Sequence, residues 1–245
     1  TYASGSHAIQ WCINQASDLN IHHLLFACGS YVSGDSNSHL PKLSSSVLFD
    51  NHGRINTDTV HDMALKHTVP FPYHIPDVDT LTNQQLGILE KKCLDEIHRR
   101  CLLARMEGTP IKSIFLELML QCNGAILSDK FLTKLGKLSS HHNFFFIVDE
   151  VLTCGRTGEF LMTNSMPDSF QSRVQYIATG KWIGMGLVLA GKDLHCGYGG
   201  DRGETTGTNY DEATKAIELF IGLIQNTFAR RAMALNELHS TEKKA

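Results

Sequence analysis

Several short segments of this 245-residue chain are apolar along most of their length, and segments with a helical pattern separate most of them. They are HLLFA (23–27), IKSIFLELML (111–120), FFFIV (144–148), VQYIA (174–178) and GLVLA (186–190). A strand with one buried face alternates apolar and polar residues, whereas a strand buried on both faces does not. The pattern therefore predicts an α/β fold, with a mostly parallel sheet that is covered by helices on both faces.

The expected helices carry apolar residues at steps of three and four positions. Their expected N-caps are Ser6, Thr82 and Ser128, and the first helix continues to about Ala16. The second helix ends at 108–110, where Gly-Thr-Pro is a typical stop. The other expectations are a loop over 29–45, irregular structure over 57–85 and a last helix over 210–236.

The composition argues against several classes of protein. A net charge of −3 without a basic stripe argues against nucleic-acid binding. No apolar run approaches the ~18–20 residues that a membrane-spanning helix needs. The seven cysteines are odd in number and form no CxxC pair, which indicates a reducing compartment. Without a visible signal peptide, we expect an intracellular, cytoplasmic protein, with the mitochondrion as the alternative. We expect no metal site, because no HExxH spacing occurs among the histidines.

The strand FFFIV ends in Asp149 and Glu150. Parallel sheets bind ligands at the carboxyl ends of their strands, so Asp149 is expected at a binding site. A carboxylate at the edge of a hydrophobic run is costly to desolvate unless a cation meets it. The sequence therefore predicts a cationic partner for Asp149.

A strand that ends in Asp-Glu has two chemical interpretations. The first is a nucleotide hydrolase, with Asp149 near Mg²⁺ and Glu150 near the attacking water. Its phosphate loop would be GSYVSGDS (29–36), where Asp35 occupies the position of the required lysine. A carboxylate there repels phosphate, which makes this interpretation the less favoured one.

The second interpretation is a site for pyridoxal 5'-phosphate, whose protonated ring nitrogen pairs with a carboxylate such as Asp149. This cofactor also needs a lysine for a Schiff base, and Lys181 follows a strand in YIATGKWIGMG. The segment Ser4-Gly5-Ser6, at the start of a helix, offers N–H groups and hydroxyls to the phosphate. Taken singly, these features are a turn residue, a surface lysine and a helix cap. Their joint order favours the cofactor.

Beyond these features, the chain resembles the class III aminotransferases, which are pyridoxal-phosphate enzymes of fold type I. The most specific motif is IVDEVLTCGRTGEF at 147–160. The other resembling segments, in the order of the family, are SGSHA (4–8), SYVSG (30–34), ELMLQCNG (117–124), TGKWIGMG (179–186) and TTGTNY (205–210). The resemblance implies a large domain over 1–236, with 237–245 as a polar tail or the start of a missing small domain.

For chemistry, the resemblance implies that Asp149 holds the pyridine N–H and that Lys181 forms the internal aldimine and moves the substrate proton. For binding, it implies that the phosphate is held by Gly5 and Ser6. It also implies a homodimer with the cofactor site at the subunit interface. Thr205 would reach the cofactor phosphate of the neighbouring subunit.

The resemblance places the aromatic ring of the cofactor between Tyr31 and Val151. The chain departs from the family at Leu152, where a glutamine is usual, and at Cys122, where many members have a glutamate. The expected function is an aminotransferase that exchanges an amino group between an amine or amino acid and an oxo acid. The alternative is a catalytically impaired relative with a structural or assembly role.

Overall fold

A computed structural model of the chain describes residues 4–17, 23–28, 30, 67–74, 80–120, 124–181, 186–190 and 222. All of them except Gly222 belong to one compact unit, Tyr2–Gly199, while Gly222 belongs to a second unit of Thr1 and Gly200–Ala245. The last helix expected over 210–236 and the expected boundary after residue 236 lie outside the described residues, Gly222 excepted.

The compact unit is built on a six-stranded sheet with the order β2-β1-β3-β4-β5-β6. The strands are β1 (Leu24–Ala27), β2 (Thr68–Val69), β3 (Ser113–Glu117), β4 (Phe145–Asp149), β5 (Val174–Thr179) and β6 (Leu187–Ala190). Neighbours from β2 to β5 pair in parallel, and β6 pairs antiparallel to β5 at the edge. The prediction of a mostly parallel sheet is therefore confirmed.

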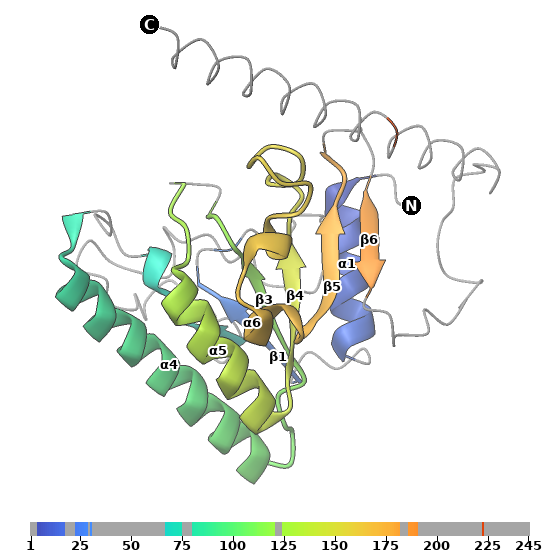
Figure 1. The fold of residues 1–245 in the computed structure, drawn as a ribbon. Helices are drawn as coiled ribbons and strands as arrows, with labels where there is room; N and C mark the ends of the chain where they lie inside the picture. The colour runs from blue at the N-terminus through green and yellow to red at the C-terminus, as the bar shows by residue number, and fades with distance from the viewer. Residues whose placement is uncertain are drawn as a thin grey trace, which may run out of the picture. The chain divides into compact units, whose positions relative to one another are not determined.

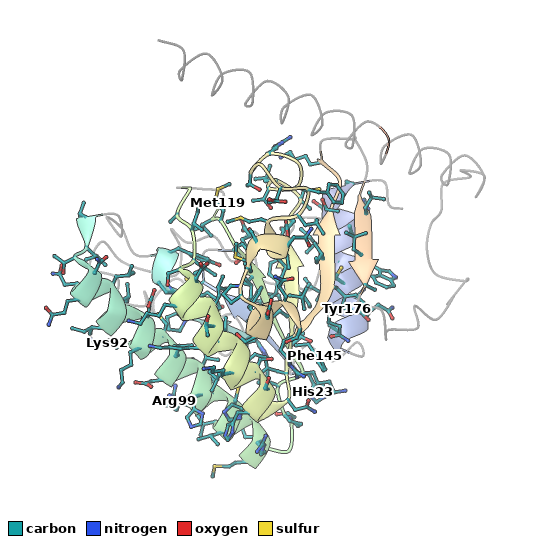
Figure 2. The ribbon with its side chains drawn as sticks, in the orientation of Figure 1. His23, Lys92, Arg99, Met119, Phe145 and Tyr176 are labelled. Carbon is teal, nitrogen blue, oxygen red and sulfur yellow. The ribbon has the colours of Figure 1, made fainter. Side chains whose placement is uncertain are left out.

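Helices cover both faces of this sheet, as predicted. The helix α1 (Gly5–Ser17) packs on one face, in a buried cluster that includes Cys12, Phe26 and Phe115. The second face carries a larger cluster, to which α4 (Asn83–Met106), α5 (Asp129–His142) and α6 (Asp168–Gln171) contribute. Figure 1 shows α4 and α5 together on one side of the strands, with α1 beside β5 and β6. Figure 2 shows Lys92 and Arg99 on α4, where both side chains are exposed.

Two of the expected helix caps are confirmed. Thr82 forms a capping box with Gln85 at the start of α4, and Ser128 Oγ accepts a hydrogen bond from the Phe131 N–H at the start of α5. Ser6 is not a cap, because α1 begins one residue earlier, at Gly5. Instead, Ser4 Oγ accepts a hydrogen bond from the His7 N–H, at 3.4 Å.

Short elements were not expected from the sequence: β2, α6 and the 3₁₀ turns η2 (Pro72–His74) and η4 (Met162–Ser165). Each is too short to show a periodic pattern of its own. None of the described helices is both long and apolar enough to cross a membrane. The described cysteines are all buried: Cys12, Cys28, Cys93, Cys101 and Cys154.

Candidate active site

A cavity of about 350 Å³ opens at the carboxyl ends of β3 and β4. Pockets for small molecules typically have volumes of about 300–1,000 Å³, so this cavity is large enough for one. Met119, labelled in Figure 2, lies on its wall just beyond β3. The cavity is lined by Ser4, Gly5, Ser6, Ile9, Glu117, Met119, Asp149, Val151, Leu152, Thr153 and Lys181.

Asp149 is an acid of this cavity with a strongly perturbed pKa. Its side chain is buried, and its Oδ1 accepts a hydrogen bond of 2.8 Å from the Val151 N–H. Burial raises the pKa of Asp149 to about 8, and the charges of Glu117 and Glu150 act in the same direction. The Val151 N–H and the charge of Lys181 act against this increase. A carboxyl in these surroundings binds either a proton or a cationic ligand.

Glu150, the next residue, does not share this role. It is fully buried, and its carboxylate accepts hydrogen bonds from the Met162 N–H at 2.7 Å and the Thr163 N–H at 2.8 Å. The hydroxyls of Thr153 and Thr163 also donate to it. Glu150 therefore fixes the loop between β4 and η4, and its oxygens are already occupied by the protein. This arrangement disfavours the nucleotide-hydrolase interpretation, in which Glu150 lies beside a water.

The beginning of α1 forms another wall of the cavity. The first N–H groups of a helix have no partner within the helix, so those of Gly5 and Ser6 can bind an anion. Gly5 packs so closely on Val151 that an added Cβ would lie 2.6 Å from Val151 Cγ1. Gly186 packs on the same turn, where a Cβ would lie 2.0 Å from the Ser4 carbonyl oxygen. Residues without side chains thus bring three distant segments together.

Lys181 lies two residues after the end of β5 and lines the same cavity as Asp149. The two side chains are close enough for the charge of Lys181 to lower the pKa of Asp149. The structure therefore gathers Gly5, Ser6, Asp149, Val151 and Lys181 around one space. Two further candidates, Tyr31 and Thr205, lie outside the described residues, as does most of the loop 29–36.

Sequence reasoning missed Glu117 as a residue of the site. Glu117 ends β3 and is the register partner of Asp149, which ends β4. The segment ELML contains Glu117. The position of Glu117 beside Asp149 depends on the register of β3 and β4, which the sequence does not specify. Among the described residues, no group of His, Cys, Asp and Glu side chains is arranged to hold a metal ion.

Comparisons with known proteins identify the family. The model of the family described as aminotransferase class-III matches residues 52–237. The chain belongs to the class-III aminotransferase family. Members of this family depend on pyridoxal 5'-phosphate. A search among curated proteins gave no match.

Two solved structures illustrate the similarity of the fold. One is a lysine aminotransferase from M. tuberculosis in its internal aldimine form, with a TM-score of 0.52 and 17% identity. The other is an S-selective transaminase from Bacillus megaterium, with a TM-score of 0.51 and 20% identity. Each alignment covers 77% of this chain and 42% of the other chain. The chain therefore has the fold of these transaminases and spans less than half of their length.

Proposed function

We propose that this chain binds pyridoxal 5'-phosphate in the cavity at the ends of β3 and β4 and serves as an aminotransferase. The observation that carries the proposal is the shared cavity of Asp149 and Lys181, with the start of α1 as a third wall. Membership of the class-III family supports it. The amino donor would be an amine or amino acid, and the acceptor an oxo acid.

The residues present fit this cofactor. Asp149 is a buried carboxyl, and among the described residues it accepts one hydrogen bond, from the Val151 N–H to its Oδ1. A protonated ring nitrogen is the cation that such a group lacks. When bound, pyridoxal phosphate supplies an electron sink for the carbanion that forms at the substrate carbon. Asp149 would hold the ring nitrogen and keep its proton in place.

Lys181 would supply the amine for covalent attachment. It lines the cavity two residues after the end of β5, and from there its Nζ would accept and return a proton at the substrate carbon. Gly5 and Ser6 would hold the phosphate through the first N–H groups of α1 and the Ser6 hydroxyl. Val151 would pack against one face of the ring. Three further parts of the proposal rest on the family alone. Tyr31 would pack against the other face of the ring. The protein would be a homodimer, in which Thr205 would bind the cofactor phosphate of the neighbouring subunit.

Absorbance of the purified chain tests the proposal. Incubation with pyridoxal phosphate should give a visible band that borohydride bleaches. Lys181→Ala should abolish the band, while Lys130→Ala, at an exposed position in α5, should retain it. A wild-type chain that stays colourless, or a Lys181→Ala variant that keeps the band, would contradict the proposal. A colourless chain would favour the alternative of a catalytically impaired relative.

A further inference from the structure

Two buried carboxyls end neighbouring strands of the sheet. Glu117 is the last residue of β3, Asp149 is the last residue of β4, and the two are register partners in a parallel pair. Adjacent strands lie about 4.8 Å apart, so these side chains start from neighbouring positions. Both side chains are buried, and both line the 350 Å³ cavity.

The alternation of side chains along the strands puts both acids on the same face of the sheet. Two residues before them, Phe115 and Ile147 are also register partners, and both pack in the cluster beneath α1. Side chains two positions apart share a face, so Glu117 and Asp149 point toward α1 as well. The two acids are thus directed at the cavity whose wall is the start of α1.

The position of Glu117 matters because like charges in a buried site oppose each other. The negative charge of Glu117 is the largest cause, after burial, of the raised pKa of Asp149. Any proton shared between Asp149 and a ligand nitrogen is held more tightly for the same reason. Glu117 therefore acts on the ligand site even where Asp149 makes the contact.

We propose that Glu117 is a positioning residue of this site, which acts through Asp149 and favours the protonated form of a bound pyridine nitrogen. The inference rests on the proposed function, because the pyridine nitrogen belongs to the proposed cofactor. Glu117 does not need to touch the cofactor. The negative charge of Glu117 is sufficient. When the ring nitrogen is protonated and Asp149 is ionised, the Glu117 carboxylate is the next negative charge beside them.

A pH titration of the bound cofactor tests this inference in the loaded protein. The spectral change that accompanies loss of the ring proton should occur about one pH unit lower in Glu117→Gln than in wild type. Affinity for pyridoxal phosphate should fall roughly tenfold in the variant. Affinity for the 1-deaza analogue, whose ring carries carbon in place of nitrogen, should stay the same. A role in folding alone would weaken both ligands equally.

A second measurement needs no cofactor. In the apoprotein, Asp149 keeps its proton up to a pH of about 8 when folded and loses it near 3.8 when unfolded. At this residue the folded state then binds more protons, so the contribution of Asp149 to the free energy of unfolding should fall as pH rises between these values. In Glu117→Gln, this fall should end at a lower pH. Glu90→Gln is the matched control, because Glu90 is also buried but bonds to Ser128 on the opposite face.

The outcomes separate the two proposals. A wild-type chain that binds neither ligand would contradict the proposed function and this inference with it. If the wild-type chain binds pyridoxal phosphate and the Glu117→Gln variant has an unchanged pH titration, only the inference is contradicted. If the glutamine variant does not fold, Glu117→Leu removes the charge without burying an amide, and the same titrations apply.

Discussion

Asp149 and Glu150 are neighbours in the sequence, yet the structure gives their carboxylates opposite surroundings. Asp149 accepts one backbone hydrogen bond and faces a cavity. Glu150 accepts bonds from two backbone N–H groups and two hydroxyls of its own loop. A hydrogen-bonded carboxylate holds structure, whereas one that faces a cavity is available to a ligand. The two acids therefore call for different experiments.

Asp149→Asn should leave the fold intact and weaken the binding of pyridoxal phosphate. An amide loses the charge-assisted bond to the ring nitrogen, which corresponds to a roughly 10- to 100-fold loss of affinity. A titration followed by absorbance measures it, with Asp95→Asn, at an exposed position in α4, as the control. Wild-type affinity in Asp149→Asn would show that the assignment of this residue is wrong.

Glu150→Gln should destabilise the fold itself. A glutamine side chain has one acceptor oxygen, so its NH₂ group would face the N–H donor of either Met162 or Thr163. The unmet backbone donor and the loss of the charged acceptor should lower the free energy of unfolding by about 2–4 kcal/mol. Urea denaturation measures this change. A decrease in the free energy of unfolding of less than half the expected value would mean that the Glu150 carboxylate does not fix the loop between β4 and η4.

At the scale of elements, the contact between α5 and α6 depends on a residue without a side chain. A Cβ at Gly136 in α5 would lie 2.2 Å from the backbone oxygen of Ser169 in α6. Backbone atoms cannot move aside as the end of a flexible side chain can. The two helices can therefore pack at this distance only with glycine at position 136.

Gly136→Ala should destabilise the protein by about 1–3 kcal/mol, because it forces α5 and α6 apart. Gly87 in α4 is the matched control, since an added Cβ there meets nothing within 4 Å. Gly87→Ala should stabilise the protein by about 0.5–1 kcal/mol through the helix propensity of alanine. Thermal or urea unfolding of both variants measures the two signs, and equal effects would refute the packing explanation.

The contact between α4 and α5 contains a titratable pair. His98 Nδ1 and His142 Nε2 lie 2.7 Å apart, and His142 Nδ1 is buried without a hydrogen-bond partner among the described residues. Burial lowers the pKa of His142 to about 4, and the charges of His98, His141 and Arg105 act in the same direction. The folded chain therefore resists protonation at this point.

Acidification should weaken the fold through His142. Between a pH of about 4 and the ordinary value of 6.5, the unfolded chain binds the proton that the folded chain excludes. This difference adds roughly +1 kcal/mol per pH unit to the slope of the free energy of unfolding, and it opposes the negative slope that Asp149 contributes over the same window. His142→Gln should make the measured slope more negative by about this amount, and His23→Gln should not change it. Urea titrations at several pH values measure the slope, and an unchanged slope in His142→Gln would exclude this residue as a contributor.

The elements with strong patterns were predictable, and those that depend on tertiary contacts were not. The strand FFFIV and the capping box at Thr82 carry local signals of their own. The strand β2 has only two residues, and it exists because β1 offers it a partner. In the site, Asp149 and Lys181 could be found from motifs, but Glu117 becomes part of the site only through strand register. The sequence does predict Gly5 at the site, but its closeness to Val151 is a packing result.

At the scale of the whole molecule, the described residues form a six-stranded sheet, its covering helices and a cavity at the carboxyl ends of β3 and β4. The alignments cover 42% of the solved transaminases named above. More than half of each of those proteins therefore has no counterpart in the alignment. For this chain, the most direct measure of ligand binding is therefore a change in stability rather than turnover.

Pyridoxal phosphate should raise the thermal unfolding midpoint of the whole chain. A ligand at 100 times its dissociation constant adds ~2.7 kcal/mol to the free energy of unfolding, which corresponds to roughly 5–10 °C at this size. Differential scanning fluorimetry with and without the cofactor measures the shift. Lys181→Ala should show a smaller rise, and an equal rise would indicate reaction with surface lysines instead.

The close approach of Gly186 to the Ser4 carbonyl joins two segments near opposite ends of the compact unit. Contacts between positions so distant along the chain form slowly, because they must offset the entropy of closing a long loop. During synthesis, α1 leaves the ribosome long before the segment around Gly186 that packs on it. We therefore expect the nascent polypeptide to take up its vitamin-derived ligand only after translation has passed β6.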